Sequence, residues 1–183
     1  MHENRQHIID QATLLFRQKG YSATSINEII GACGVTKGAL YHHFPSKEQL
    51  ALAAISQVDQ YFVQHIFITA QPPAAQASLC LQEFNRQIEA FFSQHEDGCL
   101  LANLTLELGA SYELFKTEIL RYFKRWEDSY YYLFLNFFDE AQARTIASDT
   151  LAHVQGCILM YRASGDLAAL KRVHSKINAL CPS

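Results

Sequence analysis

A short segment near residue 40 carries side chains suited to nucleic-acid contact. An ammonium group there can reach a guanine edge or a phosphate, and phenol and imidazole groups can donate to phosphate oxygens. A glycine in the same segment would let a backbone approach DNA closely. The residues are Thr36, Lys37, Gly38, Tyr41 and His42. Their spacing places them on the outer face of a short helix, which predicts that the helix N-terminus lies in the major groove of a duplex.

Cys99 is a second candidate for chemistry. It directly follows Gly98 and precedes a predicted helix from 100 to 108, whose dipole would lower the thiol pKa and favour the thiolate. The neighbouring carboxylates of Glu96 and Asp97 act in the opposite direction. Two interpretations remain open here: a reactive thiol that senses a modifying agent, or a small residue that lines a pocket or the core.

Aromatic side chains recur at helical spacing in the second half of the chain. Tyrosine and tryptophan combine an apolar body with a polar group that can orient a ligand, so the pattern predicts an apolar effector pocket. Ordinary core packing is the alternative interpretation. The predicted pocket residues are Phe84, Ile88, Phe91, Cys99, Asn103, Tyr122, Trp126 and Tyr130.

The elements that would position the first set of residues form a helix-turn-helix. A first helix begins near Ile8 and ends at Gly20. A second begins with the capping box of Ser25 and Glu28, and a short third helix follows the tight turn at Gly34. Pro45 ends the third helix, and a second capping box begins the fourth helix, where Lys47 and free backbone N–H groups would clamp a phosphate.

The remaining chain also shows helical periodicity. Helices are expected over 75–95, 100–108, 115–137, 140–163 and 167–180, with a break at Pro72 and Pro73. We therefore predict an all-α protein of about nine helices. Its domains would be a DNA-binding head over 1–50 and a larger helical domain over 51–183.

Composition excludes several other classes. The chain has 183 residues and a net charge of −3, and no run is long and apolar enough for a membrane span or a signal peptide. We expect a cytoplasmic protein that contacts no membrane. Its five cysteines are widely spaced and contain no paired motif, so neither a disulfide framework nor a metal site is expected. No cofactor fingerprint or catalytic motif occurs, which argues against an enzyme.

The segment from Gly20 to Glu48 resembles the DNA-binding head of the TetR/AcrR family of repressors. The similarity covers about residues 5–55, and two positions depart from the family pattern, where Ile30 and Cys33 replace the usual alanine. The resemblance implies an all-α homodimer in which a ligand domain follows the head. The positions that it assigns to operator contact are Thr24, Lys37, Tyr41, His42 and Lys47.

A second segment is similar to a subgroup of that family. The stretch Gly98-Cys99-Leu100, followed by Asn103 and Glu107, resembles regulators of which some members sense electrophiles. The last two helices carry apolar residues that need a partner, and the family implies a four-helix dimer bundle there. The predicted dimer residues are Val154, Gly156, Cys157, Ile158, Tyr161, Val173 and Ile177.

The sequence thus predicts a dimeric regulator that binds palindromic double-stranded operator DNA. It is expected to be a repressor released by an unknown small-molecule effector or by thiol modification. Two alternatives stay open: a helical enzyme or carrier that uses the aromatic pocket, and a DNA-binding activator.

Overall fold

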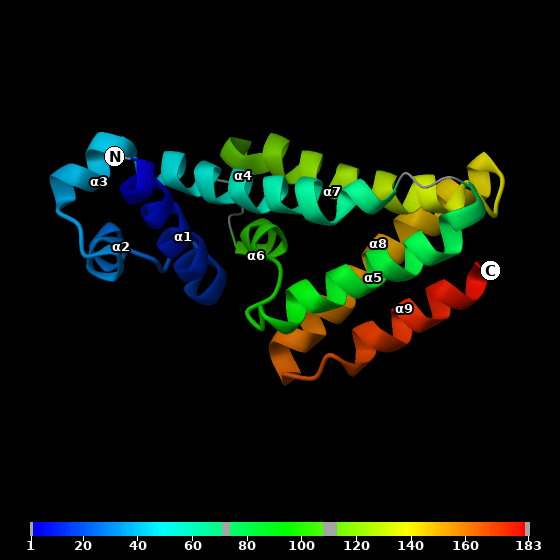
Figure 1. Cartoon of the computed structure of the whole chain (residues 1–183). Helices are drawn as coiled ribbons and strands as arrows, with labels where there is room; N and C mark the ends of the chain where they lie inside the picture. Colours follow the sequence, from blue (N-terminus) through cyan, green and yellow to red (C-terminus); the bar gives the residue numbers. More distant parts are fainter. Residues whose placement is uncertain (1, 71–73, 108–112, 182–183) are drawn as a thin grey trace. The chain divides into compact units, whose positions relative to one another are not determined.

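A computed structural model describes residues 2–70, 74–107 and 113–181, in which helices α1 to α9 and two short 3-10 helices form all of the regular structure (Figure 1). The prediction of an all-helical chain is therefore confirmed. The predicted break at Pro72 and Pro73 lies outside the described residues. The chain divides into two compact units, Met1–Gln60 with Leu100–Leu120 and Tyr61–Cys99 with Arg121–Ser183.

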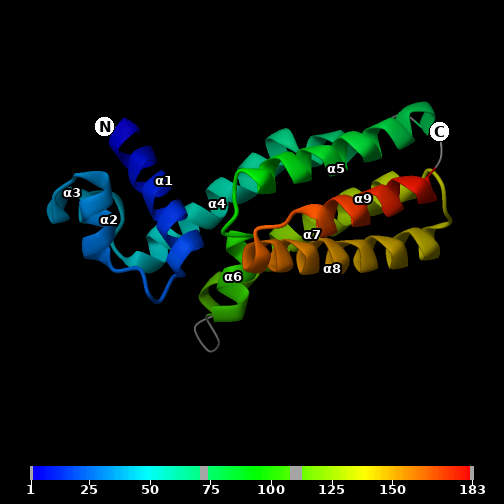
Figure 2. The same ribbon diagram turned by 90° about the horizontal axis from the view of Figure 1, so that it is seen from below.

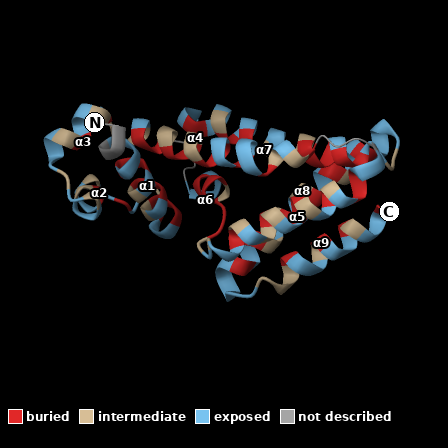
Figure 3. Cartoon of the chain, in the orientation of Figure 1, coloured by how far each residue is buried: buried red, intermediate tan, exposed pale blue. Residues whose placement is uncertain are grey.

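The N-terminal part of the first unit is a small helical bundle. It contains α1 (His2–Lys19), α2 (Ile26–Cys33), α3 (Lys37–His43) and the start of α4 (Lys47–His65). Each helix buries at least one apolar side chain, and Figure 3 colours buried residues red. Burial of this apolar surface is what holds such short helices together. The side chains that are almost fully buried include Ile8, Phe16, Ile29, Leu40 and Phe44.

Local signals set the ends of these helices. The Ser25 side chain accepts from the Glu28 N–H, and the Glu28 side chain accepts from the Ser25 N–H, so the predicted capping box is present. Gly34 ends α2 with a left-handed φ of 65°, which a glycine adopts without steric cost. At the start of α4, the Ser46 hydroxyl accepts from the Gln49 N–H at 3.3 Å.

The first unit also includes α6 (Leu100–Glu107) and the start of α7 (Glu113–Phe134). A sequence boundary at residue 50 does not anticipate this grouping, because it treats the head as one continuous segment. Contacts from α6 to α1, and from Phe115 to Tyr21, bring α6 and the start of α7 against the head.

The second unit is built from longer helices. It contains the end of α4, the 3-10 helices η1 (Phe67–Ala70) and η2 (Ala74–Gln76), α5 (Ala77–Ser93), the rest of α7, α8 (Glu140–Ser164) and α9 (Ala168–Leu180). Helix α9 packs against both α5 and α8 (Figure 2). Helix α4 ends at His65, and η1 follows it. No α-helix of the described residues is long and apolar enough to span a membrane.

Candidate nucleic-acid interface

The outer face of α3 presents most of the residues predicted to contact DNA. Lys37, Gly38 and His42 are exposed, and Tyr41 is 40% exposed, while Leu40 on the opposite side of the helix is fully buried. The Lys37 ammonium lies 5.9 Å from the centroid of the Tyr41 ring, within cation–π range. A cation and several hydrogen-bond donors therefore share one solvent-facing surface of a two-turn helix.

Thr36 and Gly38 shape the N-terminal end of that surface. The Thr36 hydroxyl caps α3 by accepting from the Ala39 N–H at 3.2 Å, and its own hydrogen remains able to donate to a phosphate. A Cβ added at Gly38 would have no neighbour within 4 Å. Packing within the protein therefore does not require a glycine here, and the space beside it is open to an approach from outside.

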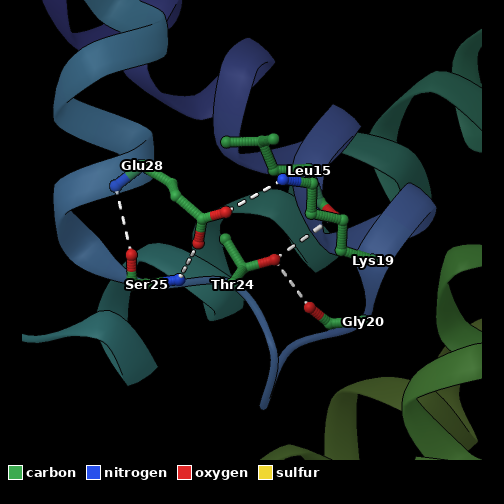
Figure 4. Close-up of polar contacts among 6 residues, drawn as sticks. All are labelled: Leu15, Lys19, Gly20, Thr24, Ser25 and Glu28. Carbon is green, nitrogen blue, oxygen red and sulfur yellow. Dashed lines mark hydrogen bonds and ion pairs between the residues drawn. The ribbon is translucent and has the colours of Figure 1, made fainter.

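Thr24 does not belong to this surface, which corrects the expectation from the family resemblance. Its side chain is fully buried, and its hydroxyl donates to the Gly20 carbonyl at 2.7 Å, with the Leu15 carbonyl at 3.3 Å (Figure 4). The Leu15 carbonyl lies in the C-terminal part of α1, and the Gly20 carbonyl directly follows that helix. The Thr24 hydroxyl therefore closes the α1–α2 turn and is unavailable to a phosphate.

Glu28 ties the same turn to the preceding helix. Besides its capping bond with Ser25, its carboxylate accepts a hydrogen bond from the Lys19 ammonium at 2.9 Å (Figure 4). The hydrogen bond from Lys19 lowers the pKa of Glu28 to about 2, and the hydrogen bonds with Ser25 act in the same direction. These bonds fix the beginning of α2 against the end of α1, and so help to orient the helix-turn-helix.

Lys47 is held differently from the exposed cation of α3. Its side chain is half-buried and its ammonium lies 4.2 Å from the centroid of the Tyr21 ring. Burial lowers the pKa of Lys47, while the carboxylates of Glu107 and Glu48 act in the opposite direction. Burial also raises the pKa of Tyr21 to about 12, with a further contribution from Glu48.

Tyr21 and Glu107 are the residues that the sequence reasoning missed at this site. The Tyr21 ring packs between Phe16, at 5.6 Å, and Phe115, at 5.5 Å between centroids. The Glu107 carboxylate accepts from the backbone N–H groups of Tyr21 and Ser22. A glycine-tyrosine pair between two helices is a turn signal, but its partners lie more than 80 residues away and leave no trace in the local sequence.

Comparison with known proteins shows which family the chain belongs to. Residues 8–54 match the family described as bacterial regulatory proteins, tetR family. Residues 73–176 match the family described as transcriptional regulator LmrA/YxaF-like, C-terminal domain. The chain belongs to the tetR family of bacterial regulatory proteins. It is accordingly a DNA-binding transcriptional regulator and not an enzyme, with an LmrA/YxaF-like C-terminal domain.

Curated relatives and solved structures agree with this assignment. The regulator LmrA of Bacillus subtilis is 30% identical over 182 residues, which cover 96% of this chain and 95% of LmrA. The repressor DhaR of Mycobacterium sp. is 32% identical over 123 residues, or 67% of this chain and 61% of DhaR. A crystal structure of a TetR regulatory protein from Rhodobacter sphaeroides superposes with a TM-score of 0.83 at 26% identity, over 96% of this chain and 97% of that one. The reduced form of Escherichia coli NemR has the same fold, with a TM-score of 0.83 at 21% identity over 98% of each chain.

The aromatic stripe of this tetR-family protein is packed core in the second unit. Tyr122, Trp126 and Tyr130 are fully buried, as are Phe84 and Ile88. The Phe62 ring lies 5.2 Å from Tyr122 and 5.3 Å from Trp126, and Phe84 meets Tyr130 edge to face at 5.0 Å. These residues fill one another's space, so the predicted hollow pocket is wrong for this structure and the core interpretation holds.

A cavity does occur in the second unit, along η1 and α7. Its volume is about 480 Å³, and it combines apolar walls with the charged side chains of Arg125 and Asp128. The lining consists of Val63, Phe67, Ile68, Ala70, Arg125, Asp128, Ser129 and Tyr132, none of which is in the predicted pocket set. Phe91 of that set instead lines a smaller groove of about 160 Å³ with Tyr61 and His65.

Cys99 and Asn103, two further members of the predicted pocket set, have separate surroundings. Cys99 is 4% exposed, so its thiol is shielded from large reagents in this structure. Asn103 is 9% exposed, and its amide donates to the Arg17 carbonyl of α1 at 3.4 Å. Asn103 therefore contacts the head. Among the described residues, no group of three or more histidine, cysteine or acidic side chains could hold a metal ion.

Four of the predicted dimer residues face the core of their own protomer. Val154, Ile158, Tyr161 and Ile177 are all at most 5% exposed, because they pack where α8 and α9 meet each other and the rest of the second unit. Apolar periodicity marks both inner and outer faces and cannot tell them apart. The other three predicted residues are accessible: Gly156 is exposed, and Cys157 and Val173 are half-buried.

Proposed function

We propose that this regulator is a repressor that binds palindromic operator DNA as a homodimer in the cytoplasm. The observation that carries the proposal is the outer face of α3, where Lys37, Gly38, Tyr41 and His42 are exposed on a helix whose other side is anchored by Leu40. A helix of this kind reads base edges near its N-terminus. The similarity to DhaR, which is named a repressor, supports repression over activation.

An exposed stripe on α8 supports the dimer. Its members follow one another at helical spacing, and all but one have small side chains; they are Ser148, Ala152, Gly156, Leu159 and Ala163. All are exposed, and Leu159 is 51% exposed. Small residues let a second helix approach closely, and a leucine leaves apolar surface to be covered. A homodimer would match a palindromic operator, whose two half-sites lie in successive major grooves about 34 Å apart.

Release from DNA would follow from an effector that favours another arrangement of the two heads. A reversible ligand is one route, supported by the cavity of about 480 Å³ along η1 and α7. Modification of Cys99 is the other route. Its place directly before the first residue of α6 means that an adduct would disturb the helix that carries Asn103 and Glu107.

The proposal is tested with the full-length protein and DNA from upstream of its own gene. Gel shifts at a fixed salt concentration should show one retarded complex. An excess of the unlabelled specific fragment should remove this complex, whereas random DNA of equal length should not. Salt must be held constant because phosphate contacts make affinity strongly salt-dependent. Retardation that random DNA competes away equally would contradict specific operator binding. Transcription from the same fragment that increases with added protein would identify an activator.

A further inference from the structure

Two side chains of α6 reach the end of α1 and the turn that follows it. Asn103 and Glu107 are four residues apart, so they lie on one face of the helix. The Asn103 amide donates to the Arg17 carbonyl in the last turn of α1. The Glu107 Oε2 atom accepts from the Tyr21 N–H at 2.7 Å, and its Oε1 atom accepts from the Ser22 N–H. One carboxylate thus holds two consecutive backbone groups of the α1–α2 turn.

The turn is shaped around that carboxylate. Gly20 has a left-handed φ of +89°, and a Cβ added to it would lie 2.6 Å from Glu107 Oε2. Glycine is therefore needed at this position both for its backbone conformation and for the space that Glu107 occupies. The Tyr21 ring is packed against Phe115 on one side and carries the Lys47 ammonium over its face.

The same turn leads directly into the helix-turn-helix. Thr24 closes it by donating to the Gly20 carbonyl, and Ser25 then caps α2, which precedes α3. A change in the position of Tyr21 and Ser22 therefore reaches the start of α2 within three residues. Glu107 lies on α6 and not on the outer face of α3. Any effect of Glu107 on DNA binding must therefore act through the position of α2 and α3.

We propose that Glu107 is a positioning residue that couples α6 to the operator affinity of α3. With its carboxylate on the turn, α2 and α3 are fixed in the orientation that binds DNA. When α6 withdraws the carboxylate, the turn is freed and affinity falls. The inference deepens the proposed function, on which it rests, by naming the contact through which regulation reaches the DNA-binding helices.

The test compares operator affinity by fluorescence anisotropy for wild type, Glu107→Ala, Glu107→Gln and a control, Glu113→Ala. Glu113 is exposed on α7 and pairs with Lys116 of its own helix, so the control removes the same charge without touching the turn. Loss of a negative charge alone should strengthen binding to DNA. We expect Glu107→Ala to bind about tenfold more weakly, within the usual range of coupling between sites. Glutamine keeps one acceptor oxygen, so Glu107→Gln should fall between Glu107→Ala and wild type.

Hydrogen exchange of the Tyr21 and Ser22 amides provides a local measurement. In wild type these amides should exchange slowly and become slower still when operator is bound, because coupling is reciprocal. In Glu107→Ala they should exchange fast with or without DNA, while circular dichroism shows an unchanged helical content. A Glu107→Ala variant that is folded and binds like Glu113→Ala would overturn the inference and leave the proposed function intact. Wild type that binds no operator would instead remove the proposed function.

Discussion

Thr24 and Thr36 are the same type of residue but have opposite roles in the head. Thr24 is fully buried and donates its hydroxyl hydrogen inward, to the Gly20 carbonyl, whereas Thr36 is exposed and caps α3. Both stand within one turn of a helix start. The role of each could not be predicted from its type, because it depends on which carbonyls the tertiary fold brings near.

The salt bridge of Glu28 makes a pH-dependent contribution to stability. Its pKa is lowered from 4.5 to about 2, so the folded state binds fewer protons than the unfolded state between these values. The stabilisation is present above about pH 4.5 and is lost as the pH falls towards 2. We expect Glu28→Gln to lower the free energy of unfolding at neutral pH and to make less difference near pH 3, where urea titrations can measure both proteins.

Glu113→Gln is the control for this titration, because Glu113 lies at the exposed start of α7 and not on the α1–α2 turn. Its effect on stability should change less between the two pH values than that of Glu28→Gln. A constant difference between wild type and Glu28→Gln at both pH values would show that the ion pair with Lys19 does not stabilise the fold.

The burial of Cys99 bears directly on the hypothesis that its thiol senses electrophiles. Because its thiol is 4% exposed, an electrophile can reach it only after a local opening, so modification should be slower than at the half-buried Cys33, Cys80 and Cys157. Methylglyoxal or a quinone should release operator from wild type and not from Cys99→Ser, as measured by gel shift. Equal release from both proteins, or from neither, would remove Cys99 from the mechanism.

At the scale of the elements, periodicity predicted where the helices lie, but it predicted poorly what each helix face packs against. The predicted start of α8 at Glu140 is that of the structure, and the stripe on α7 is indeed its buried side. Yet the stripe identified a packed core where a pocket was predicted, since a buried aromatic face looks the same whether its neighbours fill the space or leave it open. Helix ends were least predictable where no capping residue marked them, as at the end of α7, which was expected at residue 137 and lies at Phe134.

Helix α3 carries the prediction that follows most directly from exposure. Lys37→Ala or Tyr41→Ala should weaken operator binding by about 1–3 kcal/mol if each side chain makes a good contact, without altering the fold. Lys171→Ala removes the same charge from the exposed surface of α9 and is the control. Gel shifts at constant salt would measure the difference. Unchanged affinity in either α3 variant would mean that the helix docks through other residues.

At the scale of the whole molecule, the resemblance of the head predicted family and function, and the head is where local signals are dense. Capping residues, Gly34 and Pro45 each fix a helix end within a few residues. The contacts of Glu107 with Tyr21 and Ser22 could not be predicted, because they join residues more than 80 positions apart. The same holds for the inward orientation of Ile158, which was predicted to lie at the dimer interface and which the packing of α8 and α9 places in the protomer core.

Assembly can be tested on the exposed side of α8. Leu159→Arg should convert a dimer to monomers in sedimentation velocity and weaken operator binding, since a charge would be buried without a partner. Leu79→Arg, at a leucine of α5 that is 63% exposed, should leave the dimer intact. A charge at Ile158 would instead disrupt the protomer core, because that side chain is 1% exposed. A Leu159→Arg protein that remains dimeric at micromolar concentration would place the interface elsewhere.

The filled aromatic core of the second unit has a consequence for the timing of a response. Tyr122, Trp126 and Phe62 occupy the volume that a ligand at this position would need. Such a ligand enters only during the fraction of time in which the rings have swung apart, and its apparent affinity is reduced by that fraction. The observed association rate would then level off as ligand concentration rises, at the frequency with which the rings open. The speed of induction would be a property of the protein's own motion, with ligand supply setting only how often an opening is used.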